Sequence, residues 1–409
     1  MSLRLCKYLI KDTAVIFDDG TTSSIPAMNV SFFSIEKNFF QNFLPIFNFK
    51  AMVHKDLYKK INTTGCKFKI DIRKFYVDSN GDNTYDKNKV LQYPFISNVF
   101  VNTNDGDKTP YLSDAIYDRT IVSDLEQRNE YETANTELDL YLFMEDCINY
   151  RELSDKTFQD CSIIGAIMAF AQLTNQRPLL MTYPDNKEII NSLPIPDNLS
   201  FIGGIEFLQS VYGIYNKGYV LFNDFDALYL VDKSTECNAY IKNEITRVYI
   251  TYSDATKDIS QIYGQDEDRS NNRYLINCTD QPTVVDISST TSNVLFDDVV
   301  TVDTKSGTTS GSNSSDSNVK ILDNKYNNDY ALNAYKYETS MTNSIECVFK
   351  EVDIELLKVN KEYYIQFDIA NADYRKMNGN YKLMALISIY AKTDEEIFEN
   401  TIKARFIRA

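Results

Sequence analysis

Residues 193–233 read LPIPDNLSFIGGIEFLQSVYGIYNKGYVLFNDFDALYLVDK, and with residues 154–192 they form the stretch that decides the fold. The pattern predicts a helix, an extended link, a second helix and a tight hairpin. The first helix is expected to begin at Ser154, a residue type that caps helices, and to run through Leu173 until Arg177-Pro178 ends it. Because this run is apolar almost all round, we expect it to be buried on most sides.

The link and the second helix follow from proline, capping residues and spacing. Leu193-Pro194-Ile195-Pro196 predicts an extended segment. The second helix is expected to start after Asp197-Asn198, whose side chains can accept hydrogen bonds from free N–H groups, and to close at Gly218. Its apolar residues recur at three- and four-residue spacing and define one face: Leu199, Ile202, Ile205, Leu208, Tyr212 and Tyr215.

The hairpin consists of two short apolar runs, residues 219–222 and 227–231, joined by Asn223-Asp224-Phe225-Asp226. Nothing between residues 154 and 233 has the residue types of a catalytic site. The chemistry of this stretch is that of a packing and docking unit.

The flanking regions are predicted to be rich in strands. Apolar runs on either side of Asp19-Gly20 indicate a hairpin, and residues 67–73 alternate with period two. A small helix is expected near residues 50–61, and residues 136–150 fit either a strand or a short helix. Further strands are expected at residues 245–252, 273–277, 363–369, 381–392 and 402–407.

The predicted fold class is therefore α+β and mainly β, in three parts. Residues 1–150 form a β-rich domain and residues 151–236 form the helix-link-helix-hairpin module. Residues 237–409 form a second β-rich domain with a flexible Ser/Thr/Gly loop at 304–318. The 29 Tyr and 24 Phe, with no Trp, favour pleated, half-buried surfaces over helices.

The charge of the chain argues against nucleic acid as a specific ligand. The net charge is −16, whereas phosphate binding requires clustered Lys and Arg. Residues 1–76 nevertheless carry 12 basic and 6 acidic side chains, so that this part is about +6 and the remainder about −22. This asymmetry suits contact between copies or with a differently charged partner, and a solvated surface with chance bias is the alternative.

The cysteines and the N-terminus indicate a chain made in a reducing cytoplasm. Seven Cys are scattered without a Cys-x-x-Cys pair, which fits reduced thiols. The N-terminus lacks the apolar core, about 7–15 residues long, of a secretory signal. The most apolar run, residues 161–173, is far shorter than the ~20 residues that span a bilayer, so no membrane contact is expected.

Residues that often carry chemistry have ordinary structural explanations here. His54 is the single histidine, no Gly-x-Ser-x-Gly motif is present, and one His with dispersed Cys cannot supply a zinc site. Asp78, Asn80 and Asp82 resemble the start of a calcium loop, but Asn83 replaces the required Gly and Lys89 the bidentate Glu, which favours a turn.

Two further motifs of the module also favour structure over chemistry. Asp224-Phe225-Asp226 resembles a metal-binding pair of aspartates, but it lies at a predicted hairpin tip, where Asp is common. Gly203-Gly204 lies within a helix and is expected to let a neighbouring element approach closely. We therefore predict no catalytic, cofactor-binding or metal-binding residue, no cofactor and no enzymatic activity.

The order of signals from Thr157 to Lys233 resembles the central baseplate hub proteins of phage tails and related contractile injection machines. The resemblance rests on the Leu193-Pro194-Ile195-Pro196 link, on the helix ending in Tyr212-Gly213-Ile214-Tyr215 and on the strand pair with an acidic turn at residues 219–226. It covers about 80 of the 409 residues.

The resemblance implies two tail-tube-like β domains and a homotrimeric ring. Such a ring joins the hexameric tail tube to the threefold central spike, so that the implied partners are further copies, the tube protein, the spike protein and other baseplate proteins. It also implies a virion protein of the bacteriophage tail baseplate that is assembled in the host cytoplasm, with DNA passing through the channel without specific binding. An acidic chain suits such a channel, because like charge weakens adhesion.

Two other classes of function remain open from the residues alone. A receptor- or glycan-binding tail module would use the Tyr-rich, Asn- and Asp-rich surface. A hydrolase would need two carboxylates at catalytic separation in a cleft, a spatial feature that 58 acidic residues in sequence cannot reveal.

Overall fold

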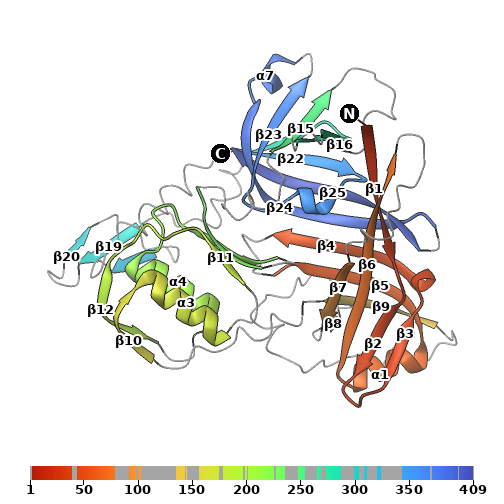
Figure 1. The fold of residues 1–409 in the computed structure, drawn as a ribbon, viewed down its shortest axis with the longest axis horizontal. Coiled ribbons are helices and arrows are strands. Elements are labelled where there is room, and N and C mark those ends of the chain that lie inside the picture. The colour runs from red at the N-terminus through yellow and green to blue at the C-terminus, as the bar shows by residue number, and fades with distance from the viewer. Residues whose placement is uncertain are drawn as a thin grey trace.

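The computed structural model is mainly β, as predicted, and contains two β regions and one helical module (Figure 1). The residues that it describes are 2–38, 44–78, 92–97, 100–102, 135–142, 144, 156–174, 178–196, 199, 201–224, 227–234, 247–253, 265–268, 273–286, 299–303, 308–310, 320–323, 343–368, 371–394 and 396–408.

The first β region is built from the N-terminal part of the chain. Its alternating runs place apolar side chains in the core, as in β2, where Thr13, Val15 and Phe17 are buried and the residues between them are half-buried. Its strands are β1 (Ser2–Ile10), β2 (Thr13–Phe17), β3 (Thr22–Ile25), β4 (Val30–Asn38), β5 (Ile46–His54), β6 (Cys66–Asp78), β7 (Gln92–Ser97), β8 (Phe100–Asn102) and β9 (Asn135–Leu142), with the short helices η1 (Ala27–Asn29) and α1 (Lys55–Thr63).

The second β region is built from the C-terminal part of the chain. Its long strand pair β24–β25 runs in antiparallel register with a shift between Leu383 and Ala385. Its elements are β15 (Arg247–Ser253), β16 (Gln265–Asp268), β17 (Arg273–Asn277), β18 (Thr283–Asp286), β22 (Asn343–Lys350), η7 (Ile354–Leu356), β23 (Glu362–Asp368), α7 (Ala372–Arg375), β24 (Gly379–Lys392) and β25 (Ile397–Arg408). A separate small sheet contains β19 (Val299–Asp303), β20 (Thr308–Ser310) and β21 (Lys320–Asp323).

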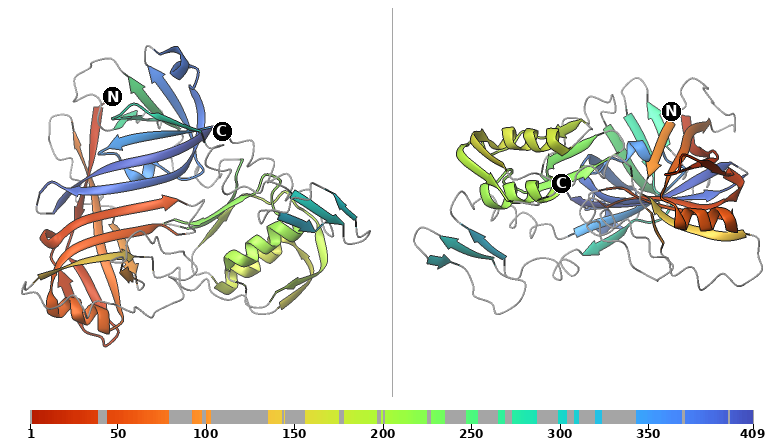
Figure 2. Two further views of the ribbon diagram at one scale, coloured as in Figure 1. Left: turned by 180° about the vertical axis from the view of Figure 1, so that it is seen from behind. Right: turned by 90° about the horizontal axis from the view of Figure 1, so that it is seen from below.

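The two β regions share one continuous sheet. β4 pairs antiparallel with β24, from Phe33 opposite Tyr390 to Asn38 opposite Ala385. β1 pairs with β6 of its own region and also with β16 and β25 of the other. Within the described part of the chain, seventeen strands thus belong to one hydrogen-bonded sheet. The two views of Figure 2 show the helical module beside this sheet rather than within it.

The helical module packs two helices with two small sheets. The predicted order of helix, extended link, second helix and hairpin is confirmed, and all four lie within residues 154–233. Its elements are β10 (Lys156–Ser162), α3 (Ile163–Thr174), β11 (Leu179–Met181), β12 (Ile189–Ile195), α4 (Phe201–Phe207), the π-helical turn η4 (Leu208–Tyr212), β13 (Tyr219–Asn223) and β14 (Leu228–Asp232).

The predicted start of the first helix is wrong, because residues 156–162 form a strand. β10 pairs antiparallel with β12, with Phe158 opposite Leu193, so that the link predicted as extended supplies a partner strand. The helix starts only where the Ser162 hydroxyl accepts a hydrogen bond from the Gly165 N–H at 3.2 Å. The helix is also less buried than predicted, since Met168 on α3 is 45% exposed. Ser154 lies outside the described residues.

The predicted end of the second helix, at Gly218, is also wrong. The helix widens into η4 and ends at Gly213, whose φ of 77° lies in the region that favours glycine. The Gln209 side chain accepts hydrogen bonds from the N–H groups of Ile214 and Tyr215 at 3.1 and 3.0 Å, which stabilises the exit from the helix. Gly218 instead occupies the turn before β13, with a φ of 81°.

The second helix also starts later than predicted, because Leu199 lies in a β-bridge and α4 begins at Phe201. The other predicted elements are confirmed within the described residues, apart from the loop at 304–318. The hairpin at Asp19-Gly20 is β2–β3, the small helix is α1, and residues 136–150 begin as the strand β9. Of the predicted loop at 304–318, the described residues 308–310 form β20 instead, in keeping with the preference of Thr for strands. No helix in the described residues is long and apolar enough to cross a membrane.

Candidate functional site

The junction between the helical module and the two β regions contains a buried cluster of charged groups. The hairpin β13–β14 carries Asp224, which the sequence assigned to an ordinary turn. Asp224 does lie at the tip of this hairpin, where its N–H donates to the Ala227 carbonyl, but it is buried and ion-paired, which the sequence did not predict. Its carboxylate accepts a hydrogen bond from Lys37 Nζ at 2.6 Å, and the side chains of Lys37 and Asp224 are only 2% and 1% exposed.

A third segment also reaches Asp224. Lys358, which follows η7, places its Nζ 3.5 Å from the second carboxylate oxygen of Asp224. One carboxylate of the module thus contacts one lysine from each β region. The Asp224 N–H donates to the Ala227 carbonyl at 3.0 Å, which fixes the backbone that carries the carboxylate.

The far end of the hairpin makes a second set of contacts with the C-terminal β region. Asn360 Nδ2 donates to the Asp232 carbonyl at 3.2 Å, and Lys382 Nζ donates to the Lys233 carbonyl at the same distance. Both donors are buried. The hairpin is therefore held at each end by donors from the β regions.

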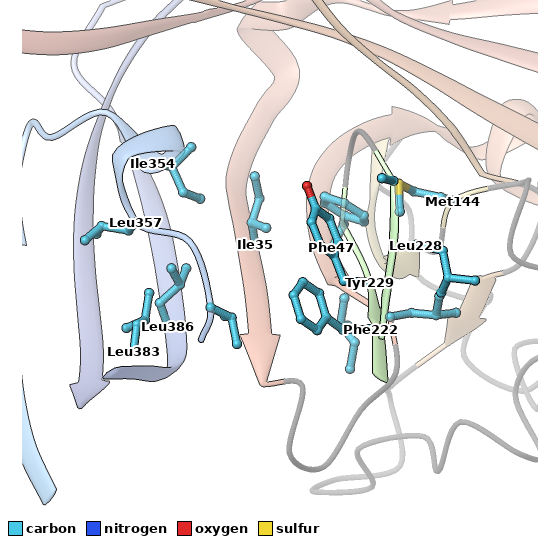
Figure 3. Packing of buried hydrophobic residues seen from close by; sticks show 14 of the residues in the cluster. Ile35, Phe47, Met144, Phe222, Leu228, Tyr229, Ile354, Leu357, Leu383 and Leu386 are labelled. Atoms are coloured by element: carbon cyan, nitrogen blue, oxygen red, sulfur yellow. The ribbon is translucent and has the colours of Figure 1, made fainter. Parts of the chain in front are cut away.

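Apolar packing fills the space between these polar contacts. Phe222 and Tyr229 stack face to face across the hairpin with ring centroids 4.8 Å apart. Figure 3 shows these rings together with Ile35 and Phe47 of the first β region, and Leu383 of the second belongs to the same buried cluster. The interface is therefore a continuation of the core, which argues against a loosely tethered module.

A second buried polar cluster joins the two β regions to each other. Lys74 Nζ on β6 donates to the Asp353 carboxylate at 2.6 Å and also bonds Glu355. Tyr76 donates its hydroxyl to the same Asp353 oxygen at 2.6 Å. Burial would lower the pKa of Lys74, but the charges and hydrogen bonds of Asp353 and Glu355 outweigh burial and raise it. The lysine is therefore held in its charged form.

The backbone beside Asp353 is satisfied by further buried side chains. Tyr8 on β1 donates to the Val352 carbonyl at 3.2 Å and accepts from the Ile354 N–H at 3.1 Å. Asn400 on β25 exchanges two hydrogen bonds with the backbone of Val352, at 2.8 and 3.1 Å. These contacts hold the segment between β22 and η7 against β1 of the first region and β25 of the second.

Among the described residues, those that the sequence singled out do not form a common site. His54 caps α1, where its Nδ1 accepts from the Asp56 N–H at 3.3 Å, and its side chain is mostly exposed. Gly204 is buried on α4, and α3 is in contact with α4; the close approach of a neighbour at Gly203-Gly204 stays a prediction. Residues 79–83 of the calcium-like motif lie outside the described residues. No group of His, Cys, Asp and Glu within the described residues could hold a metal ion.

Sequence reasoning missed Lys37 and Lys74, although a signal exists for both. On β4 the alternating positions Phe33 and Ile35 are buried and Lys37 continues the same face. On β6, Ile70 and Ile72 precede Lys74 in the same way. A lysine at an inward position of an alternating strand requires a buried acceptor, so the pattern predicts an ion pair without identifying its partner.

We expect the protein to lose stability above about pH 9. Burial raises the pKa of the Cys66 thiol from 9.0 to about 12, with a smaller contribution from Asp18, and burial likewise raises the pKa of Tyr8 and Tyr76. In the unfolded chain these groups ionise at their ordinary pKa, so the stability from keeping them neutral is lost as pH rises past that value. Each group should lower the unfolding free energy by about 1.4 kcal/mol per pH unit.

Urea unfolding between pH 7 and pH 11 measures this loss. Cys66→Val should flatten the decline between pH 9 and 10, because it removes one of the ionising groups. An unfolding free energy that stays constant up to pH 11 would contradict the expectation.

The comparisons with known proteins agree with this architecture. A family model described as "Bacteriophage PBS1 gene 109 protein" matches residues 6–403. The tail protein from Neisseria meningitidis MC58 is 8% identical with a TM-score of 0.52, over 98% of this chain and 96% of that one. The 43 kDa tail protein of prophage MuSo2 from Shewanella oneidensis is 9% identical with a TM-score of 0.52, over 97% and 98% of the two chains.

A longer chain shares the fold as well. One chain of the lidded Francisella PdpA-VgrG complex is 11% identical with a TM-score of 0.51; the match covers 99% of this chain but only 53% of that one. No curated protein matches the sequence. At these identities the solved structures show the fold alone, and they confirm the predicted resemblance at that level.

Proposed function

The chain belongs to the bacteriophage PBS1 gene 109 protein family, and from this membership we propose that it is a structural hub of a phage tail baseplate. In this proposal three copies form a ring that joins the hexameric tail tube to the threefold central spike. The observation that carries it is the end-to-end match with tail proteins, which covers nearly all of both chains.

The internal construction of the protomer supports a role under mechanical load. The two β regions share one sheet through β4–β24 and β1, and the buried cluster around Lys74 ties them together a second time. The helical module is fixed by the Asp224 junction to both regions. Breaking any of these contacts exposes apolar surface or buried charge, so the protomer resists internal movement.

We propose that the chain has three structural parts, residues 1–150, 151–236 and 237–409.

The charge distribution also bears on contacts with other chains. Residues 1–76 carry about +6. Within this segment Lys37 and Lys74 are paired with acids of the same chain, and the remaining excess suits an acidic neighbour, such as the acidic remainder of another copy or a partner protein. The net charge of −16 suits a channel through which DNA passes without adhering. The protein acts in this proposal without catalysis, as part of the virion tail after assembly in the host cytoplasm.

Native mass spectrometry and electron microscopy of the purified chain test the proposal. We expect a species of three times the chain mass and rings with threefold symmetry, formed by the chain alone or on addition of the tube and spike proteins. Measurements from low to high salt serve as the control, because non-specific charge-driven clusters should dissociate as salt rises. A chain that remains monomeric with both partner proteins present would refute the hub.

A further inference from the structure

Two cysteines from distant parts of the chain lie side by side in the C-terminal β region. Cys278 directly follows β17, and its N–H donates to the Thr251 carbonyl at 2.9 Å. The N–H and the hydroxyl of Thr279 both donate to the Val348 carbonyl, at 2.9 and 3.3 Å. These bonds hold residues 278–279 beside residues 347–348 of β22.

Both cysteines of the pair are buried. Cys278 and Cys347 are free thiols, 2% and 0% exposed, on backbones that the bonds of residues 278–279 hold together. Cys347 is held in turn by the pairing of β22 with β25, where it lies opposite Ala404. Two thiols on neighbouring, hydrogen-bonded backbones have the arrangement from which a disulfide forms with little movement.

We propose that Cys278 and Cys347 form a redox site that closes to a disulfide after the assembled particle leaves a reducing compartment. The oxidant is a low-molecular-weight disulfide. The thiolate of one cysteine attacks it, forming a mixed disulfide and releasing one small thiolate. The second protein thiol, after losing its proton, attacks the protein sulfur of that mixed disulfide and releases the other small thiolate. The two protein thiols thus lose two electrons and two protons, which the small disulfide gains.

The environment of the pair sets when this reaction occurs. Burial raises the pKa of the Cys278 thiol, and its interaction with Cys347 raises it further. The thiolate of Cys278 is therefore scarce at neutral pH, which slows attack by this sulfur on the oxidant. Once formed, the bond closes the chain between residues 278 and 347 and restricts the unfolded state.

Oxidation of the full-length protein by oxidised glutathione at pH 8.5, followed by denaturing alkylation and peptide mass spectrometry, tests the proposal. We expect two of the seven thiols to disappear and a Cys278–Cys347 peptide to form, with a rise in the thermal midpoint on the order of 5 °C. Addition of a reducing agent should reverse both changes.

Two variants separate this site from general oxidation. Cys347→Ala should abolish the cross-link and leave Cys278 reduced or bound to glutathione. Cys66→Ala, which removes another buried cysteine on β6, should leave the cross-link intact. A wild-type protein that keeps both thiols after prolonged oxidation, or that links either cysteine to a different partner, would overturn the proposal.

Discussion

Replacing Asp224 by Ala is expected to lower the unfolding free energy by about 3–5 kcal/mol. The carboxylate is buried between Lys37 and Lys358, and its removal takes a negative charge away from a lysine whose side chain is 2% exposed. Lys358 is 16% exposed and can turn its ammonium towards water, whereas Lys37 cannot do so without moving β4. The loss should be measured by urea unfolding of the full chain.

The exposed pair of Arg405 with Glu346 supplies the matched control. Both side chains are nearly half exposed, so Glu346→Ala removes the same kind of interaction where water replaces it, and the change should stay within about 1 kcal/mol. A double variant, Asp224→Leu with Lys37→Met, should recover much of the stability because it replaces the buried Lys37–Asp224 pair by apolar side chains. An Asp224→Ala loss no larger than the Glu346→Ala loss would show that the junction does not hold the module.

Local patterns in the sequence were sufficient to predict most of the fold. The hairpin β13–β14 follows from two apolar runs around an acidic turn, and β25 follows from alternation that places Phe398, Ile402 and Phe406 in the core. Where the prediction failed, the deciding contact was distant in sequence. Residues 156–162 resemble the start of a helix, but pairing with β12, about thirty residues later, makes them a strand.

The candidate site could be predicted only in part, for the same reason. The inward position of Lys37 on β4 is visible in the alternation of its strand, but its partner lies 187 residues away on another element. Asp224 has the sequence of a common hairpin turn, and only the docking of that turn against two β regions gives it a buried role. The π-helical turn likewise depends on Gln209 bonding the backbone beyond the helix, a contact that residue type alone does not specify.

Replacing Lys74 by Met should have an effect of similar size, about 3–5 kcal/mol, at the boundary between the two β regions. Lys74 is buried and bonds Asp353 and Glu355, so that the Met variant leaves the nearly buried carboxylate of Asp353 without its cation. Glu355 is 31% exposed and can regain water. Differential scanning calorimetry should show the loss as a lower transition temperature, and hydrogen exchange should rise on both β6 and residues 352–356.

Adding Asp353→Asn to Lys74→Met separates charge from packing. Asparagine at position 353 carries no charge, so no buried carboxylate is left without a cation. Its side-chain oxygen can still accept the hydrogen bond that Asp353 receives from the Glu355 N–H at 3.0 Å, and asparagine caps helices as well as aspartate does. The double variant should therefore be more stable than Lys74→Met alone. Lys376→Met is the control, because both side chains of its pair with Asp373 are mostly exposed and the change should cost about 1 kcal/mol or less. If the double variant were no more stable than the single one, lost packing of the lysine stem, and not the unbalanced carboxylate, would be what weakens the boundary.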